Sequence, residues 1–313
     1  MSRVIHTGQA LVDVVVEVPG LPARGQNVMA TTVTGYAGGA VTVLTAAARF
    51  GADCVHAGAH GTGPHGDLIR TALETEGIGV SALPVAGLDT GICVVLVEPS
   101  AERTFVTTLG AEREISVESL AASHPRAGDL VCVTGFSLAL GSTRDPLLAW
   151  LPTLDPDVVV VLDPGAAFAG LSGHVRASML GVTDVWTSNA EEAADLLRAV
   201  GQNAPSDLAA LTRAVAPLLG GDAVAVVRDG PEGCAVHAAG ETTYVTGYPQ
   251  TPLDTNGAGD THTGALLAAV AAGTPWPEGC RRANAAAAIK VTRRGPESAP
   301  TAAEVEEFLA TVS

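Results

Sequence analysis

The stretch DTNGAGDTHTGALLAA, residues 254–269, joins a glycine-rich loop to an alanine-rich segment with the composition of a helix. Backbone N–H groups in the first turn of a helix have no partner within the helix, and the helix dipole favours negative charge there. Glycine lets such a backbone approach an anion closely, so Gly257, Ala258 and Gly259 can present N–H groups to a phosphate. Asp260 then lies within reach of a hydroxyl that attacks this phosphate. The stretch predicts an anion-binding loop with a base beside it, and the alternative is an Asp-rich turn with an N-terminal cap.

The length and hydropathy of the chain set its broad class. With 313 residues it can form one large α/β domain or two smaller ones. Hydrophobic residues make up 47%, but no uninterrupted apolar run approaches the length of a membrane span. The first residues, MSRVIHTGQALVD, have polar breaks where a signal peptide needs an apolar stretch. We therefore expect a cytoplasmic protein with no membrane partner.

The charge and the rarer residue types argue against several functions. The formal net charge is −16, from 33 acidic and 17 basic residues, which makes nucleic acid an unsuitable partner. Lys290 is the only lysine. The five cysteines form no CxxC pair and the eight histidines no HExxH signature, so neither a disulfide framework nor a zinc site is expected. Buried free thiols are the expected state of the cysteines.

Strand-like and helix-like segments alternate along the chain, which predicts a mostly parallel sheet flanked by helices. The expected strands are RVIHTG (3–8), CVHAGA (54–59), DLVCVTG (129–135), DVVVVLD (157–163), TDVWTSN (183–189) and DAVAVVRDG (222–230). The expected helices include residues 37–51, 67–77, 190–201 and 207–220, and the end of the chain, after the strand at 222–230, is expected to be mostly helical.

Two segments interrupt this alternation. Residues 11–37 and 90–108 have the alternation and the Pro/Gly turns of hairpin strands. We interpret them as a small accessory sheet that covers a cleft at the carboxyl ends of the main strands, where open α/β sheets bind ligands. The chain is thus expected to be a single domain, 1–313, with these two lid segments inserted.

Several motifs together resemble those of the ribokinase-like (PfkB) carbohydrate kinases. DTNGAGD (254–260) is similar to the family signature DTxGAGD, with His262 where phenylalanine is usual. Four further stretches resemble family motifs: GQALVD (8–13), GYAGGAVTVLTAAARFGA (35–52), NAEE (189–192) and ANAAAAIKVTRRGPESAPTAAEVEEFL (283–309). The resemblance covers most of the chain. It implies an α/β fold, a three-layer sandwich with a mostly parallel central sheet flanked by helices and a small β-sheet lid.

The resemblance also implies roles for particular residues. Asp260 matches the catalytic base that takes a proton from the sugar hydroxyl, and Gly257, Ala258 and Gly259 match the anion hole. GQALVD resembles a first strand that ends in a sugar-binding aspartate, here Asp13. Three positions thus match the acceptor site: Asp13, Gly38 and Gly39. Five positions match the nucleotide side: Asn189, Glu192, Gly230, Gly233 and Asn284.

ATP, magnesium and potassium are the cofactors that the resemblance implies. Asn189 and Glu192 match the pair that organises magnesium and the phosphates, with Glu192 acting through water, and magnesium keeps several waters in such sites. The potassium ligands would be the Asp254 carboxylate and backbone carbonyls near Asn256, Lys290, Arg293 and Gly295, since a weakly hydrated cation suits carbonyl coordination. The charges of Arg293 and Arg294 are the alternative to this ion.

The expected function is ATP-dependent phosphorylation of a hydroxyl of a small sugar or sugar-like polyol, by a homodimer. Such transfer needs positioning, charge neutralisation and a base, and a carboxylate such as Asp13 can accept from two neighbouring hydroxyls. Ala40 and Val43 stand where relatives often carry polar residues, so other side chains can contribute to the acceptor site: Gln9, Asn27, Tyr36, His60 and Arg103. A nucleoside kinase of the same superfamily and a non-catalytic sugar or nucleotide sensor remain as alternatives, and the sequence does not choose the sugar.

Overall fold

The main body is built on one large sheet. The computed structural model describes residues 2–100 and 102–312. Its nine-stranded sheet has the order β13-β12-β11-β10-β9-β8-β1-β4-β5, and the pairs from β11 through to β5 are parallel. The strands are β1 (Arg3–His6), β4 (Asp53–His56), β5 (Gly79–Val80), β8 (Leu130–Thr134), β9 (Val159–Asp163), β10 (Val185–Asn189), β11 (Val224–Arg228), β12 (Gly233–Ala238) and β13 (Glu241–Thr246).

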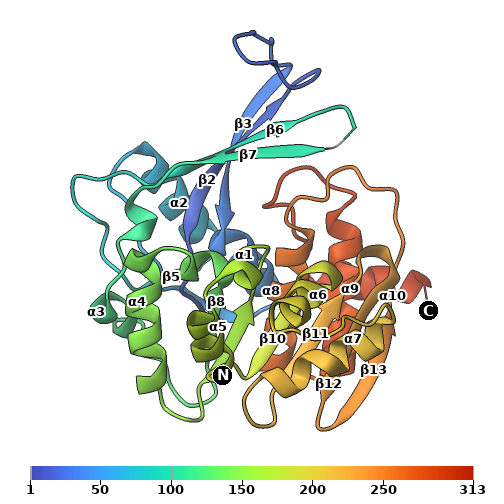
Figure 1. The fold of residues 1–313 in the computed structure, drawn as a ribbon. Helices are drawn as coiled ribbons and strands as arrows, with labels where there is room; N and C mark the ends of the chain where they lie inside the picture. The colour runs from blue at the N-terminus through green and yellow to red at the C-terminus, as the bar shows by residue number, and fades with distance from the viewer. Residues whose placement is uncertain (1, 101, 313) are drawn as a thin grey trace.

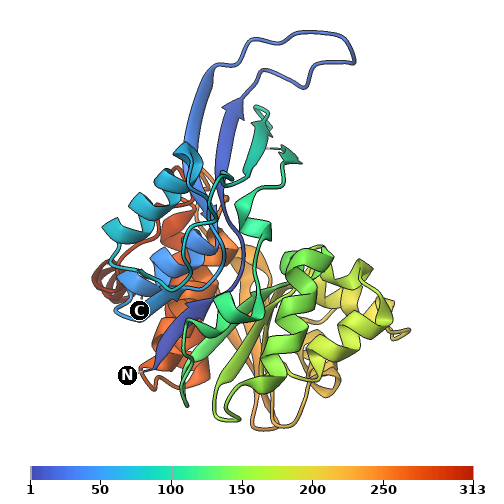
Figure 2. The same cartoon turned by 90° about the vertical axis from the view of Figure 1, so that its left-hand side faces the viewer.

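Helices cover both faces of this sheet, as Figure 2 shows: the helices coloured blue and red lie on one side and the green and yellow ones on the other. The first face carries α1 (Ala40–Arg49), α2 (Pro64–Thr75), α8 (Ala258–Ala271), α9 (Trp276–Lys290) and α10 (Ala302–Val312). The second carries α3 (Val117–Ala121), α4 (Gly141–Trp150), α5 (Gly173–Leu180), α6 (Ala190–Ala199) and α7 (Leu208–Val215). Short 3₁₀ turns are η1 (Ala111–Arg113), η2 (Gly135–Leu138), η3 (Leu151–Thr153), η4 (Phe168–Gly170), η5 (Ala216–Leu218) and η6 (Gly230–Glu232).

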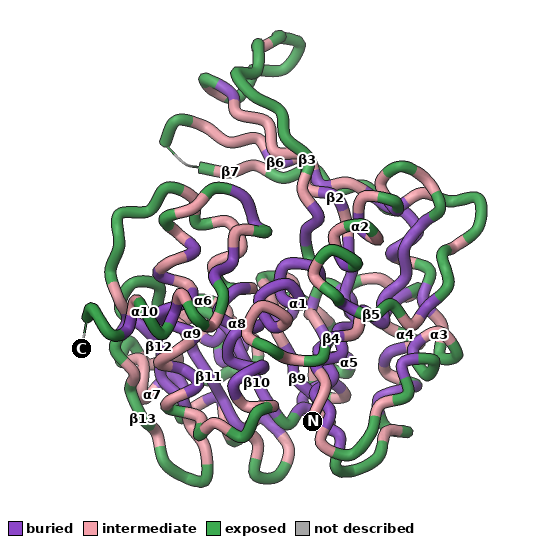
Figure 3. Tube along the Cα trace, turned by 180° about the vertical axis from the view of Figure 1, so that it is seen from behind, coloured by how far each residue is buried: buried purple, intermediate pink, exposed green. Residues whose placement is uncertain are grey.

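The apolar strands explain why the sheet is covered twice. A strand such as β8, whose sequence is LVCVT, has apolar side chains on both faces, and parallel strands of this kind require a layer on each side. Two hydrophobic cores result, one beneath each helix layer, with Leu44 and Leu266 in the first and Leu147 and Trp186 in the second. Figure 3 shows the main strands buried between the layers. This arrangement confirms the predicted α/β sandwich.

A second, smaller sheet rises above the main body (Figure 1). This small sheet has the order β3-β2-β6-β7, with β2 (Ala10–Glu17), β3 (Thr32–Gly39), β6 (Ile92–Val97) and β7 (Arg103–Thr107). The antiparallel pairs β2–β3 and β6–β7 are the two hairpins expected in residues 11–37 and 90–108, and parallel pairing of β2 with β6 joins them. The connection between β2 and β3 is mostly exposed (Figure 3).

The structure corrects two expectations. The region after β11, expected to be mostly helical, first forms the β12–β13 hairpin, in which both strands add antiparallel to the edge of the main sheet. Its turn uses Ala239 and Gly240, both at positive φ, and alanine is an uncommon residue there, so the usual Asn-Gly turn signal is missing. Asp13 does not end the first strand, which stops at His6. It lies within β2, paired with Tyr36.

The five cysteines are free and buried, as expected. Within residues 2–100 and 102–312, no helix combines the length and the apolar character needed to cross a membrane.

Candidate active site

The glycine-rich loop of residues 254–260 leads directly into α8. Gly257 is the N-cap of this helix and has the left-handed φ of 75° that glycine adopts without strain. Ala258 begins the helix, and Asp260 lies in its first turn. The backbone N–H groups of this turn lack helical acceptors and therefore suit an anion. The local geometry matches the predicted anion hole with a carboxylate beside it.

A cavity of about 590 Å³ opens at this turn. It lies where β9, β10 and β11 end, the edge of a parallel sheet at which ligands bind in open α/β folds. The cavity brings together all nine residues that were assigned to catalysis and to the nucleotide side: Gly257, Ala258, Gly259, Asp260, Asn189, Glu192, Gly230, Gly233 and Asn284. Four separate parts of the chain thus converge on one space.

The carboxyl group of Asp260 has an environment that favours its protonated form. Burial raises its pKa to about 7, and the negative charges of Asp163, Asp13 and Glu192 add to this effect. The positive charge of Arg228 opposes the rise. A carboxyl group with a pKa near neutrality can both accept and release a proton at physiological pH, which is what a general base requires.

Two residues of this centre, Asp163 and Arg228, were not foreseen. Asp163 ends β9 and Arg228 ends β11, and the Arg228 Nη2 lies 3.7 Å from the Asp163 Oδ2. The Arg228 Nη1 donates to the Gly259 carbonyl at 3.2 Å and to the Thr263 hydroxyl at 2.6 Å. Burial raises the pKa of Asp163, and Arg228 limits the rise. A signal was available, because each is a charged residue at the end of a buried strand.

Asn189 and Glu192 form a capping box at the start of α6. The Asn189 side chain accepts from the Glu192 N–H at 2.8 Å, and the Glu192 carboxylate accepts from the Asn189 N–H at 3.0 Å. Burial, and next the charge of Asp163, raise the pKa of Glu192. The pair therefore has a structural role in addition to facing the cavity, and its part in organising magnesium stays a prediction.

Gly230 and Gly233 frame the turn between β11 and β12. Gly230 has a φ of 52° and Gly233 a φ of 110°. A Cβ on Gly233 would lie 2.2 Å from the Val245 carbonyl oxygen, so only glycine allows this close approach. Both residues line the cavity with backbone alone.

The Asn284 side chain is fully used within the protein. Its amide nitrogen donates to the carbonyls of Val245 and Thr246 at 3.1 and 3.2 Å, and its oxygen lies 3.1 Å from the His262 Nε2. Asn284 therefore fixes the cavity wall between α9 and β13. His262 is buried in this contact.

The acceptor positions lie around Asp13. A Cβ on Gly38 would come within 2.3 Å of the Asp13 Oδ2, so the glycine leaves room for the carboxylate. A Cβ on Gly39 would lie 2.3 Å from the Gln9 carbonyl oxygen. Burial raises the pKa of Asp13 to about 6. Asp13 is close enough to Asp260 for its charge to raise the pKa of that residue, so the two carboxyl groups belong to one electrostatic centre.

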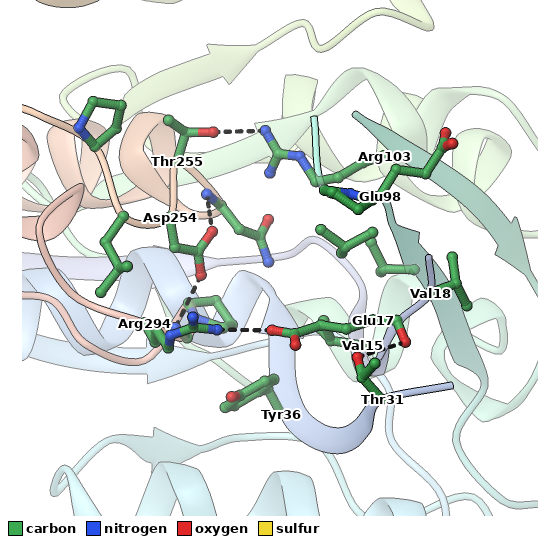
Figure 4. A pocket seen from close by; sticks show the side chains of 18 of the residues that line it. Val15, Glu17, Val18, Thr31, Tyr36, Glu98, Arg103, Asp254, Thr255 and Arg294 are labelled. Carbon is green, nitrogen blue, oxygen red and sulfur yellow. Dashed lines mark hydrogen bonds and ion pairs between the residues drawn. The ribbon is translucent and has the colours of Figure 1, made fainter. Parts of the chain in front are cut away.

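A second cavity, of about 510 Å³, separates the small sheet from the loops around residues 252–256 and 294–296 (Figure 4). Two contacts bridge it: the Glu17 carboxylate pairs with Arg294 at 2.7 Å, and Arg103 donates to the Thr255 hydroxyl at 2.8 Å. Thr255 lines both cavities, so the spaces adjoin.

The other candidate acceptor residues lie in three kinds of place. Tyr36 and Arg103 line the second cavity. Gln9 and His60 are buried, and Asn27 is exposed in the connection between β2 and β3.

The residues assigned to the monovalent cation lie together behind the anion hole. The two carboxylate oxygens of Asp254 accept from the N–H groups of Asn256, at 2.8 Å, and Gly295, at 3.0 Å. The Lys290 ammonium group contacts the Asp254 carbonyl and the Arg293 carbonyl. Among the described residues, no group of three or more His, Cys, Asp and Glu side chains could hold a metal ion.

Comparisons with known proteins agree with this geometry. The family model "pfkB family carbohydrate kinase" matches residues 1–302. The uncharacterized sugar kinase YegV of Escherichia coli is 29% identical over an alignment of 310 residues, which covers 97% of this chain and 93% of YegV. A ribokinase of Haemophilus influenzae is 28% identical, over 93% of this chain and 91% of its own.

Solved structures agree as well. Arabidopsis thaliana ribokinase complexed with ribose and ATP has a TM-score of 0.80 and 25% identity over 99% of both chains. Thermotoga maritima ribokinase shares the fold, with a TM-score of 0.82 at 22% identity over 99% of this chain and 100% of its own. This chain therefore belongs to the pfkB family of carbohydrate kinases.

Proposed function

We propose that this kinase transfers the terminal phosphoryl group of ATP to a hydroxyl of a small, uncharged polyol, with Asp260 as the general base. The observation that carries the proposal is the position of Asp260, in the first turn of α8 beside the N–H groups of Gly257–Gly259, with its pKa raised to about 7. Base and anion hole are thus held by one rigid helix start.

In the proposed reaction Asp260 removes the proton of the acceptor hydroxyl while the hydroxyl oxygen attacks the terminal phosphorus. The bond between this phosphorus and the bridging oxygen of ATP breaks, and ADP leaves with the electron pair. The N–H groups of Gly257, Ala258 and Gly259 stabilise the negative charge on the transferred group, and each such donor contributes about 3 kcal/mol in comparable sites. Asp13 orients the acceptor by accepting from its other hydroxyls.

On the nucleotide side, Gly230 and Gly233 line the cavity with backbone atoms that ATP can approach closely, and Asn284 forms part of the cavity wall. Magnesium fits this site, since the charge of Asp163 raises the pKa of both Glu192 and Asp260, and these three carboxyl groups concentrate negative charge where phosphates would bind. Asn189 and Glu192 would hold it, partly through water, and the ion would neutralise phosphate charge.

The charges around the site favour an uncharged acceptor. Asp13 and Asp260 supply negative charge at the acceptor position, which would repel a sugar acid or a sugar phosphate. The two arginines at the second cavity already have partners, since Arg103 binds Thr255 and Arg294 binds Glu17. The first acceptors to test are therefore uncharged sugars, like those that give the ribokinase and fructokinase relatives their names.

The small sheet is the proposed lid and dimer surface. Its outer strands β3 and β7 are sheet edges, and Val33, Phe105 and Val106 on them are exposed. Exposed edges with apolar side chains favour pairing with a second chain. We infer a cytoplasmic homodimer, and light scattering at micromolar concentration checks the dimer.

A screen of pentoses, hexoses, polyols, sugar acids and nucleosides tests the proposed function. ADP release is measured with magnesium and ATP, and the Asp260→Asn variant is the control for contaminating kinases. We expect one uncharged polyol to be preferred. Preference for a sugar acid would overturn the acceptor class, and equal turnover by the variant would overturn the role of Asp260.

A further inference from the structure

Lys290 is the one lysine of the chain, and its side chain is 0% exposed. It is the last residue of α9, and its ammonium group contacts Asp254, in the loop that leads into the proposed anion hole. The Nζ lies 3.2 Å from the Asp254 carbonyl oxygen, 3.4 Å from the Arg293 carbonyl oxygen and 4.0 Å from the Asp254 Oδ2. Three oxygens of two loops thus surround one buried positive charge.

A buried ammonium group is costly unless oxygen atoms replace its water. Burial lowers the pKa of Lys290, while the negative charges of Asp254 and Glu297 oppose this and favour the charged form. A methionine or leucine would fill the same space without this cost. The charge itself therefore needs an explanation.

The position of the ammonium group supplies one. Asp254 accepts from Asn256, the residue before Gly257, and from Gly295 in the turn that follows α9. The charge of Lys290 lies between these two loops and contacts a carbonyl from each. It thereby holds the Asp254 segment, and with it the start of α8, in a fixed place.

Potassium was expected at this place, with the Asp254 carboxylate and nearby carbonyls as ligands. The residues do not fit the ion. The carbonyls of Asp254 and Arg293 already accept from Lys290, and the ammonium charge would repel a second cation. Arg293 and Arg294 do not take the ion's place, since Arg293 pairs with Glu304 at 2.6 Å and Arg294 pairs with Glu17 at 2.7 Å.

We propose that the Lys290 ammonium group is a built-in substitute for the monovalent cation. It is a positioning residue, which acts on the reaction by fixing the loop that carries the anion hole, and it makes phosphoryl transfer independent of potassium. The activity readout rests on the proposed function, so a second readout without substrate accompanies it.

The experiment compares the wild type with Lys290→Ala and Lys290→Met. Turnover is measured in potassium chloride, ammonium chloride and tetramethylammonium chloride at equal ionic strength. We expect equal turnover of the wild type in all three salts. Lys290→Ala in tetramethylammonium should lose about 10- to 100-fold in kcat, because small displacements of catalytic groups have effects of this size.

The two variants differ in the space they leave. Alanine opens room among the carbonyls, so potassium or ammonium ions should restore much of the turnover of Lys290→Ala. Methionine fills that room without a charge, so Lys290→Met should stay impaired in every salt. A purely structural role of Lys290 would give no such dependence on the salt.

Thermal unfolding without substrate gives the second readout. The midpoint of Lys290→Ala should rise in potassium over tetramethylammonium, while those of the wild type and Lys290→Met should not. A wild type that needs potassium for turnover would overturn the proposal, even if both variants failed to fold. Equal turnover of Lys290→Ala and wild type in tetramethylammonium would overturn it too. A wild type that transfers no phosphoryl group in any salt, with the unfolding shifts present, would refute the proposed function alone.

Discussion

Asp260→Asn should abolish most turnover and at the same time stabilise the protein at alkaline pH. Asparagine keeps the shape of the side chain but cannot take up the proton of the acceptor hydroxyl. Loss of a general base lowers kcat by about 10²–10⁴. The anion hole consists of backbone N–H groups, so the affinity for ATP should change little.

The expected stabilisation follows from the pKa of Asp260. Its pKa is raised from 3.8 to about 7 in the folded chain. Between these values a folded chain binds more protons at Asp260 than an unfolded one, so the contribution of this group to stability falls as pH rises and is lowest once the group is ionised. A rise of roughly three pH units sets an upper limit of about 4 kcal/mol. Because the residue Asp260 keeps some contact with solvent although burial raises its pKa, screening should reduce the effect to about 1–2 kcal/mol.

Urea unfolding in EDTA at pH 5 and at pH 8, with kinetics on the preferred acceptor, checks both parts. We expect the variant to gain more over the wild type at pH 8 than at pH 5. An equal gain at both pH values would refute the reasoning on charge repulsion. Wild-type turnover by the variant would refute the assignment of the base.

Three further outcomes follow from the same contacts. Glu192→Gln keeps a residue that can cap α6, yet it should raise the magnesium concentration for half-maximal velocity by about 10- to 100-fold. An unchanged magnesium titration would count against a role of Glu192 in holding magnesium. Arg228→Met removes a charge that lowers the pKa of Asp260, so the acidic limb of the pH profile of kcat/KM should move to higher pH; a limb that stays in place would contradict it. Gly264→Ala places a Cβ 2.2 Å from the Val43 carbonyl oxygen, where α8 packs on α1. Urea unfolding should show a loss of about 1–3 kcal/mol, and unchanged stability would mean that the helices can separate freely.

The local geometry of the proposed anion hole and base could be predicted because it depends on neighbouring residues. A glycine-rich loop, a helix that begins after it and a carboxylate in the first turn all follow from residues 254–269. The buried strands and the two hairpins of the small sheet were likewise evident, since alternation and apolar runs are local patterns. The β12–β13 hairpin was not, because its turn at Ala239 and Gly240 lacks the usual residues.

The electrostatic centre depended on the tertiary structure. Asp163 and Arg228 end strands that are far apart in sequence, and only the order of strands in the sheet brings them to Asp260. Asp13 is placed by the pairing of β2 with β3, and the lack of a side chain at Gly38 makes room for it. Charge interactions depend on distance through space, so a sequence alone cannot give their strength.

Lys290 illustrates the same division. The sequence placed it at the end of a helix, next to a turn whose carbonyl groups suit a cation. In the folded chain its side chain is buried and contacts Asp254, a residue 36 positions away. The resemblance to the family loops implied a positive charge at this place. Tertiary packing brings the buried Lys290 ammonium group within reach of these carbonyls, and this contact is why we propose that it takes the place of a free ion.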